Sequence, residues 1–517
     1  MTFKDIHTHT QNYHSRHAMS KLLHSELLAS GHSSGFYSFV KSLADCTSKA
    51  EEHGRVDAEL KRLSDRMGHP DISSARMKDY MIRLIHVFML GYDVSFGTIY
   101  AIMATQSGET ALDRRVGYIA ATLFLQKNHD LTIMLVNTLQ RDLASQNHLD
   151  RCAALTSICY LDHAEMQDAV LEKVLQCMEY PKQIVRKKAA IALLCLYQRT
   201  PDLLPQLEPY FRQALLDKDH SVVFAALSIW KYIVSIVPDP GKYEDLVPVI
   251  THILNDTMEG RNYQRSFIYH GVPAPWAQVA CLQILGTFLK HGVGSQQDIY
   301  KVVVVCLTQA EHQVDAAYAI ILECIHVFNT IDALLLENLM EAEELSPFRV
   351  LDRFLDSGNH TLRYLGLSGL ERIDLNLWSD DWLDGRQLSK ILETSQTDMT
   401  IIYKTLAILD KLLVFKKNTH ARLQYMQAMG ASIQKAVANT QAEKAVHERL
   451  SRWYLDRVIR YPFFYENLHT RRLSPFAHAI LNSFRKHFWK YRLSLASTDC
   501  HPCLGPFMQG PAGRVLR

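Results

Sequence analysis

Residues 79–106 read DYMIRLIHVFMLGYDVSFGTIYAIMATQ, and residues 112–125 read LDRRVGYIAATLFL. In each piece the apolar residues recur with the period of an amphipathic helix. Gly91 and Gly108 fall where such helices end, since glycine is favoured just beyond a helix C-terminus. These two pieces therefore predict short helices that follow one another through tight turns.

The same helical pattern extends from Phe36 to about Ala438, and strand-like alternation is nearly absent. At four places a branched residue is followed four positions later by a small one, with starts 33, 36 and 37 residues apart. The pairs are Val116 and Ala120, Leu149 and Ala153, Val185 and Ala189, and Val222 and Ala226, with a weaker copy at Leu362 and Gly366. Residues i and i+4 share one helix face, so the branched residue fills a core while the small one lets a neighbouring helix approach. Repeated helix pairs of this kind predict an all-α, HEAT- or armadillo-like solenoid.

Three segments follow from this pattern and from charge. Residues 1–35 are polar and predicted to be disordered, and residues 36–438 form the predicted solenoid, opening with a long helix from Phe36 to Met67 that Gly54 weakens. Residues 439–517 form a divergent tail, predicted to be partly disordered. From Arg449 to Arg517 the chain has 12 basic and 3 acidic residues, which sets this end apart from the rest.

Composition indicates a folded protein, with 48% hydrophobic and 21% charged residues among 517. No apolar run approaches the ~18 residues of a membrane span, and the N-terminus lacks the apolar centre of a signal peptide. We therefore expect a cytoplasmic protein. Its ten cysteines are scattered, as expected of reduced and mostly buried thiols.

Motifs for catalysis and cofactor binding are absent: there is no P-loop, no GxGxxG after a strand, no GxSxG and no HExxH. Cys500 and Cys503 have a ligand-like spacing, but a structural zinc site needs four ligands and no second pair follows. The basic, aromatic tail is interpreted as a poorly ordered end rather than a nucleic-acid site. We predict no enzyme activity, no metal and no cofactor.

Several stretches resemble the adaptins, the large subunits of vesicle-coat adaptor complexes. The resemblance is carried by MLGYDVSFG and RRVGY and continues in order through DCTSKAEE (45–52), NTLQRDLAS (137–145), IVRKKAAIALL (184–194), VPAPWAQVACLQILG (272–286), YAIILECI (318–325) and LRYLGLSGL (362–370). The wording is most similar to the epsilon chains of adaptor protein complex 4, and the alpha chain of the plasma-membrane complex also has VPAPW and LRYL. The resemblance fades after Ile401. Residues 449–517 match neither the hinge nor the appendage of adaptins, as in a short isoform or a truncated gene model.

The resemblance implies a scaffold in a complex of two large, one medium and one small subunit. It further implies recruitment by an Arf-family GTPase to trans-Golgi membranes, peripheral binding there, and sorting of transmembrane cargo by its tails into vesicles. Three alternatives remain: an alpha- or gamma-type adaptin of a clathrin adaptor, an unrelated HEAT-repeat scaffold such as a nuclear transport receptor, and an enzyme on a helical scaffold.

The resemblance also suggests two contact sites. In related chains a basic patch before the LGxD turn binds phosphoinositide head groups, and the matching residues here are Arg76, Lys78, Tyr80 and Arg83. The alternative is a solvated helix face with a buried Tyr80. Ala44 occupies the position of an alpha-chain arginine near the pocket for acidic dileucine cargo signals, so we expect weak or no binding of such signals. Lys41, one turn earlier, is the remaining candidate for cargo contact.

Overall fold

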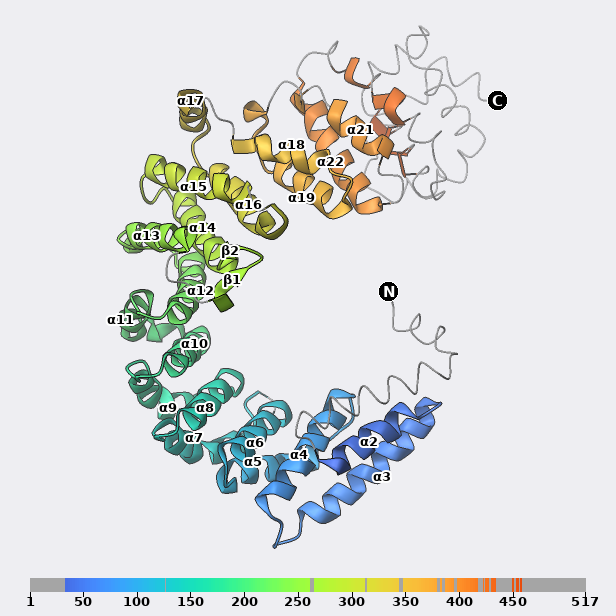
Figure 1. Ribbon diagram of the computed structural model, residues 1–517, viewed down its shortest axis with the longest axis vertical. Coiled ribbons are helices and arrows are strands. Elements are labelled where there is room, and N and C mark those ends of the chain that lie inside the picture. The colour runs from blue at the N-terminus through green and yellow to red at the C-terminus, as the bar shows by residue number, and fades with distance from the viewer. Residues whose placement is uncertain are drawn as a thin grey trace, which may run out of the picture. The chain divides into compact units, whose positions relative to one another are not determined.

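Helices make up almost all the regular structure of the chain in the computed structural model (Figure 1). The structure describes residues 33–457 except 126, 261–264, 312–313, 344–346, 379–381, 384–385, 395–397, 417–421, 423, 427–428, 434–448, 451 and 455. The described chain divides within α12 into two units, the first ending at Ile233 and the second beginning at Val234. The prediction of one continuous trunk did not include this division.

The first unit is built from helix pairs arranged in two rows. One row stacks α4, α6, α8 and α10 side by side, and α5, α7 and α9 form the other row, each packed on a helix of the first (Figure 1). The bounds are α2 Ser34–Ala44, α3 Lys49–Met67, α4 Ser74–Met89, α5 Thr98–Ser107, α6 Ala111–Phe124, α7 Val136–Leu143, α8 His148–Tyr160, α9 Ala164–Cys177, α10 Gln183–Arg199, α11 Leu204–Leu215 and α12 His220–Ile236. This two-row stacking confirms the predicted solenoid.

The second unit repeats the arrangement. Here α14, α16, α19 and α22 form one row, and α13, α15, α18 and α21 pack on them. The bounds are α13 Leu246–Glu259, β1 Ile268–Tyr269, β2 Val272–Pro273, α14 Pro275–Lys290, α15 Gln296–Glu311, α16 Val314–Phe328, α17 Ala333–Glu343, α18 Val350–Leu355, α19 His360–Leu370, α21 Arg386–Thr394 and α22 Met399–Phe415. The two strands pair antiparallel. Single 3₁₀ turns join helices at Ser95–Gly97, Asp130–Leu135, Pro201–Leu203, Pro240–Tyr243, Arg265–Phe267, Pro347–Arg349 and Leu375–Leu377.

A small residue recurs at the seventh position of α6, α8, α10, α12 and α19. These residues are Gly117, Ala154, Ala189, Ala226 and Gly366, all buried, and the first four are spaced 37, 35 and 37 residues apart. A Cβ at Gly117 would lie 2.6 Å from the backbone nitrogen of Thr105 in α5, so only glycine permits this approach. The predicted pairs at Val185 and Val222 have the correct register. The pair predicted at Leu149 is wrong, because Leu149 is 55% exposed. The small residue at the seventh position of α8 is Ala154, not Ala153.

Arginine occupies the fourth position of three consecutive row helices and binds the turn that precedes each helix. Arg114 donates to the Gly108 carbonyl at 3.0 Å, Arg151 to that of Ser145 at 2.6 Å, and Arg186 to that of Tyr180 at 2.9 Å. In each case the acceptor lies six residues earlier in the chain. The acceptors are carbonyls of the turns between helices, where the backbone needs partners outside the helical pattern, so each repeat fixes its own turn.

The predicted opening helix from Phe36 to Met67 is wrong in one respect. It is two helices, α2 and α3, separated by residues 45–48. The Ser48 side chain accepts from the Glu51 backbone N–H at 3.2 Å, which starts a new helix. Gly54, the expected weak point, lies inside α3 with nothing near its Cβ position.

The ends of the predicted segments lie largely outside the described residues, namely 1–32, 434–448 and 458–517 with Cys500 and Cys503. Two described residues of the predicted tail contact α22: Trp453 and Arg457 both donate to Asp410. Across the described ranges, no single helix has both the length and the apolar composition to cross a membrane. Two consecutive segments, Ala317–Phe328 and Ala333–Glu341, meet the length and composition only when they are taken together, and the chain bends by 115° between them.

Candidate partner-binding surface

The residues predicted to bind phosphoinositide lie on α4, but the structure does not bring them onto one open face. Lys78 pairs with Asp113 of α6 at 2.8 Å and is 27% exposed. Burial would raise the pKa of the Asp113 carboxyl, but hydrogen bonds from Lys78 and Thr110 outweigh it and lower that pKa to about 2. Lys78 is therefore engaged in holding α4 against α6.

Arg83 and Tyr80 are both buried. Arg83 pairs with Glu59 of α3 at 3.0 Å and with Asp79 one turn earlier in α4. An arginine bound to two carboxylates has little charge to offer a phosphate. Of the four predicted residues, only Arg76 is exposed. The predicted patch is thus reduced to Arg76 with a partly exposed Lys78, and contact with a phosphoinositide stays a prediction for these two.

Lys41 is exposed on α2, and Ala44 is exposed as the last residue of that helix. Phe36 and Phe39 on the other side of α2 pack edge-on against the ring of His86 in α4, with centroids 5.7 and 6.2 Å apart. Burial lowers the pKa of His86. Helix α2 therefore presents Lys41 from an element that is anchored to α4, and its contact with cargo stays a prediction.

A more extensive surface lies on α6, α8 and α10. We name it the apolar strip, and it consists of Leu112, Ile119, Leu123, Leu149, Tyr160, Ile184 and Ile191. These residues take the second, ninth or thirteenth position of their helices, which share one face because 7 and 11 residues are close to whole turns. The three helices are neighbours in one row, so exposed apolar residues recur at equivalent positions of adjacent helices.

Each residue of the apolar strip is at least 37% exposed, and Tyr160 reaches 70%. Contiguous exposed apolar side chains on a folded protein mark sites where other proteins bind. Covering seven such half-exposed side chains would contribute on the order of 5–10 kcal/mol before the costs of association. The strip is therefore able to hold a polypeptide partner.

The charge around the apolar strip is positive. Helices α6, α8 and α10 together contain seven Lys and Arg residues and two acidic ones, Asp113 and Asp150. Both of these acidic residues are buried, and Asp150 pairs with Arg114 at 2.5 Å. Carboxylates outside these helices also pair with three of the cations, Arg114, Arg186 and Arg199. The surplus of positive charge therefore rests on Arg115, Arg151, Lys187 and Lys188. Arg115, by contrast, is exposed on α6. The complementary partner surface is thus apolar and carries carboxylates.

Two thiols meet at the edge of the apolar strip, Cys159 at the end of α8 and Cys195 at the thirteenth position of α10. A hydrogen bond from Cys159 lowers the pKa of Cys195 to about 7, against the opposing effect of burial. The pKa of Cys159 is raised by the same contact and by burial.

The apolar strip was not predicted from the sequence, although the sequence contains its pattern. The stretch LDRRVGYIAATLFL contains a second apolar face, Leu112, Ile119 and Leu123, opposite to the buried one. A helix with two apolar faces needs two partners, one within the fold and one outside it.

No group of three or more potential metal ligands occurs within the described part of the chain.

Comparison with known proteins points to one family. Residues 52–418 match the model described as adaptin N terminal region. The AP-4 complex subunit epsilon of Arabidopsis thaliana is 37% identical over 385 residues, 74% of this chain and 39% of that protein. The human AP-4 complex subunit epsilon-1 is 36% identical over 338 residues, 65% of this chain and 29% of that protein.

The AP-2 complex subunit alpha-1 of Arabidopsis thaliana is 25% identical over 445 residues, 82% of this chain and 43% of that protein. The chain thus spans less than half the length of these relatives. The higher identity to the epsilon subunits confirms the predicted similarity to that branch. Since the family model covers well over half of the sequence, the chain belongs to the adaptin family.

Proposed function

We propose that the chain acts as a large-subunit scaffold of an adaptor complex of the AP-4 type, in vesicle-mediated sorting of transmembrane cargo at the trans-Golgi network. In this role it binds a small, a medium and a second large subunit, and it makes and breaks no covalent bond. Its membership of the adaptin family and its 36–37% identity to AP-4 epsilon subunits support this role.

The apolar strip is the observation that carries the proposal. Its residues would be unfavourable in water on a protein that acts alone, and the positive charge of α6, α8 and α10 selects a partner with carboxylates. We assign the strip to the small subunit of the complex. The solenoid supplies a rigid row of three helices, so little conformational entropy is lost when the partner docks.

Membrane and cargo contacts complete the proposal. Recruitment by an Arf-family GTPase would place the chain peripherally on trans-Golgi membranes, from the cytoplasmic side. Arg76 and Lys78 are the residues of α4 still open to a phosphoinositide, and Lys41 on α2 is the cation available to a cargo tail. These contacts follow from the resemblance to adaptins and from exposure.

Co-purification with the AP-4 small subunit tests the proposed role. We expect the full chain to retain that subunit, and the triple variant Ile119→Glu, Leu149→Glu and Ile184→Glu to lose it, because three carboxylates would be buried against apolar atoms. All three wild-type residues are 41–55% exposed, so the variant should still fold. Leu334→Glu, at a 68% exposed position of α17, is the matched control and should bind normally.

Retention of the small subunit by the triple variant would show that the apolar strip is not its binding site. Failure of the unaltered chain to retain any adaptor subunit would contradict the scaffold role itself. Recovery of Ran instead would favour a nuclear transport receptor.

A further inference from the structure

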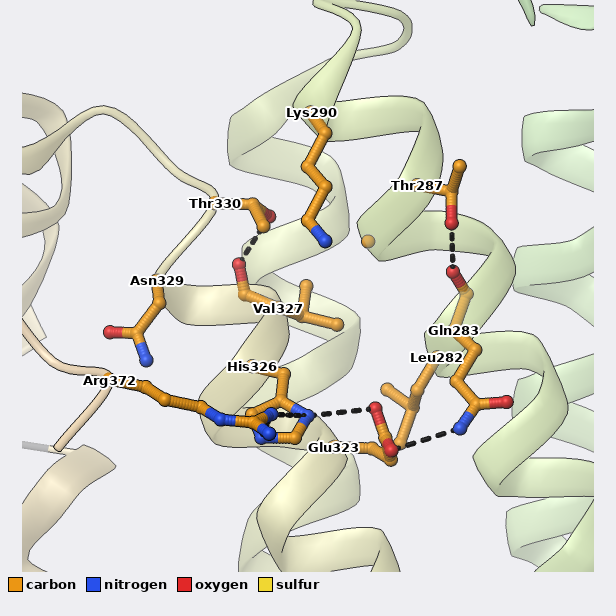
Figure 2. A pocket seen from close by; sticks show the side chains of 11 residues that line it. Leu282, Gln283, Thr287, Lys290, Glu323, His326, Val327, Asn329, Thr330 and Arg372 are labelled. Atoms are coloured by element: carbon orange, nitrogen blue, oxygen red, sulfur yellow. Dashed lines mark hydrogen bonds and ion pairs between the residues drawn. The ribbon is translucent and has the colours of Figure 1, made fainter. Parts of the chain in front are cut away.

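A small cavity lies in the second unit where α14, α16 and α19 end (Figure 2). Its volume is about 320 Å³, near the lower limit of ligand pockets, which suits a side chain and its peptide group better than a nucleotide. Leu282 and Val327 supply apolar walls, and Lys290, Asn329 and Arg372 supply polar groups. This cavity is separate from the apolar strip, which belongs to the first unit.

The one carboxylate that lines the cavity is already matched. Glu323 accepts a hydrogen bond from Gln283 at 2.9 Å and pairs with His326 at 3.1 Å. Arg372 contacts the other nitrogen of the His326 ring, so the ring lies between the Arg372 guanidinium and the Glu323 carboxylate (Figure 2). The chain Gln283–Glu323–His326–Arg372 therefore fixes the geometry of the cavity. Its lining has two cationic side chains, Lys290 and Arg372, against the single carboxylate of Glu323.

Two cations face this space. Lys290 is the last residue of α14 and its ammonium group points into the cavity (Figure 2). Neither Lys290 nor Arg372 forms an ion pair with a carboxylate among the residues that the structure describes. They are not needed to cap the helices, because the Phe288 carbonyl accepts from the backbone of His291 and Val293, and the Val327 carbonyl from Thr330. Both charges are thus available to an anion.

Asn329 adds a second requirement. Both polar atoms of its side-chain amide are buried and have no hydrogen-bond partner. Leaving such a group unpaired costs free energy, which a ligand with one donor and one acceptor would recover. A peptide group offers this pair of atoms, a carbonyl oxygen and an N–H, whereas an isolated carboxylate offers acceptors alone.

We propose that this cavity binds an extended acidic segment of a partner polypeptide. The backbone of the segment pairs with the Asn329 amide, and the carboxylate of a neighbouring Asp or Glu side chain lies between Lys290 and Arg372. Leu282 and Val327 contact the methylene groups of that side chain. The proposed peptide site extends the proposed scaffold role. It rests on that role in one respect, because we take the ligand to be a polypeptide.

A fluorescently labelled hexaglutamate peptide is a direct probe, with hexaglutamine as the neutral comparison. We expect the full chain to bind hexaglutamate preferentially in fluorescence anisotropy, and Lys290→Ala and Arg372→Gln each to weaken that binding about tenfold, equivalent to ~1.4 kcal/mol. Asn329→Ala should weaken both peptides by a similar factor, because its contact is to the backbone. Lys301→Ala, an exposed lysine of α15 outside the cavity, is the matched control.

Equal binding by the three cavity variants and the control would overturn the proposal. So would displacement of hexaglutamate by inorganic phosphate beyond the effect of chloride at the same ionic strength, because the site would then be selective for a free oxyanion. Thermal unfolding of each variant checks that its fold is intact. Co-purification of the small subunit is independent of these variants, so a failure here is distinguishable from a failure of the scaffold role.

Discussion

Arg186 in α10 shows how one side chain can join three parts of the first unit. Its guanidinium donates to both oxygens of Asp217, at 2.7 and 2.8 Å, and to the carbonyls of Tyr180 and Pro181. Burial would raise the pKa of Asp217, but the bonds from Arg186 and from the Asp219 backbone outweigh it and lower that pKa. The pair thus connects α10 both to the turn before it and to the turn before α12.

Replacing Arg186 with alanine should destabilise the first unit by about 3 kcal/mol, because the half-buried Asp217 loses its partner. Arg186→Lys should recover only part of this, since an ammonium group cannot make the paired contact. The folded-state pKa of Asp217 is lowered, so the pair stabilises the fold above the ordinary pKa of aspartate and this contribution is lost as the pH falls through the lowered value. Thermal midpoints of both variants and the unaltered chain, at pH 7 and below pH 4, measure this.

The gap in thermal midpoint between Arg186→Ala and the unaltered chain should therefore shrink in acid. An equal gap at both pH values would contradict the role given to the Asp217 carboxylate.

At the scale of the helix, two glycines in opposite surroundings distinguish the effect of backbone propensity on stability from the effect of packing. Gly54 lies in the interior of α3, where no atom lies within 4 Å of the position that a Cβ would take, whereas a Cβ at Gly117 in α6 would meet the α5 backbone. Glycine in an open helix costs stability relative to alanine because it loses more backbone entropy on folding. At Gly117 the same residue is required by the crossing of two helices.

Gly54→Ala should stabilise the chain by up to about 1 kcal/mol. Gly117→Ala should destabilise it by about 1–3 kcal/mol, because the added methyl group forces α5 and α6 apart. Chemical denaturation followed by circular dichroism measures both changes. A stabilising Gly117→Ala would mean that α5 and α6 are not packed as closely as described.

At the scale of the whole molecule, rows of helices that contact only their neighbours make stability local. In such arrays the free energy is close to a sum of repeat terms and nearest-neighbour terms. The division into two units within α12 supports this view. Damage to one repeat should therefore spread to adjacent helices and fade with distance along the row.

Hydrogen exchange of the Gly117→Ala variant tests this locality. We expect faster exchange of amides in α4, α5, α6 and α8, whereas amides in α14 and α16 of the second unit should exchange at the rate of the unaltered chain. Gly366→Ala in α19 is the reciprocal variant and should spare the first unit. Uniform acceleration throughout both units would show that the chain unfolds as one cooperative body.

The fold could be predicted from the sequence because a period of 3.6 and recurring small residues report directly on helices that pack in rows. The register at Leu149 was wrong because Ala153 and Ala154 are both small, and spacing alone cannot choose between them. The lipid-contact residues could not be judged from sequence, since the partners that bury Arg83 and engage Lys78, namely Glu59 and Asp113, lie 24 and 35 residues away. The cavity with Asn329 also depends on three helix ends that only the folded chain brings together.

The arginine at the start of α6, α8 and α10 has an evolutionary consequence. Arg114, Arg151 and Arg186 each stabilise a turn that lies six residues earlier in the sequence. A duplicated segment of DNA that spans one repeat would therefore encode both the turn and the arginine that stabilises it. Arrays of this kind can lengthen by duplication without a new turn sequence between the repeats. Mutations elsewhere in the duplicated repeat then create new surfaces for recognition.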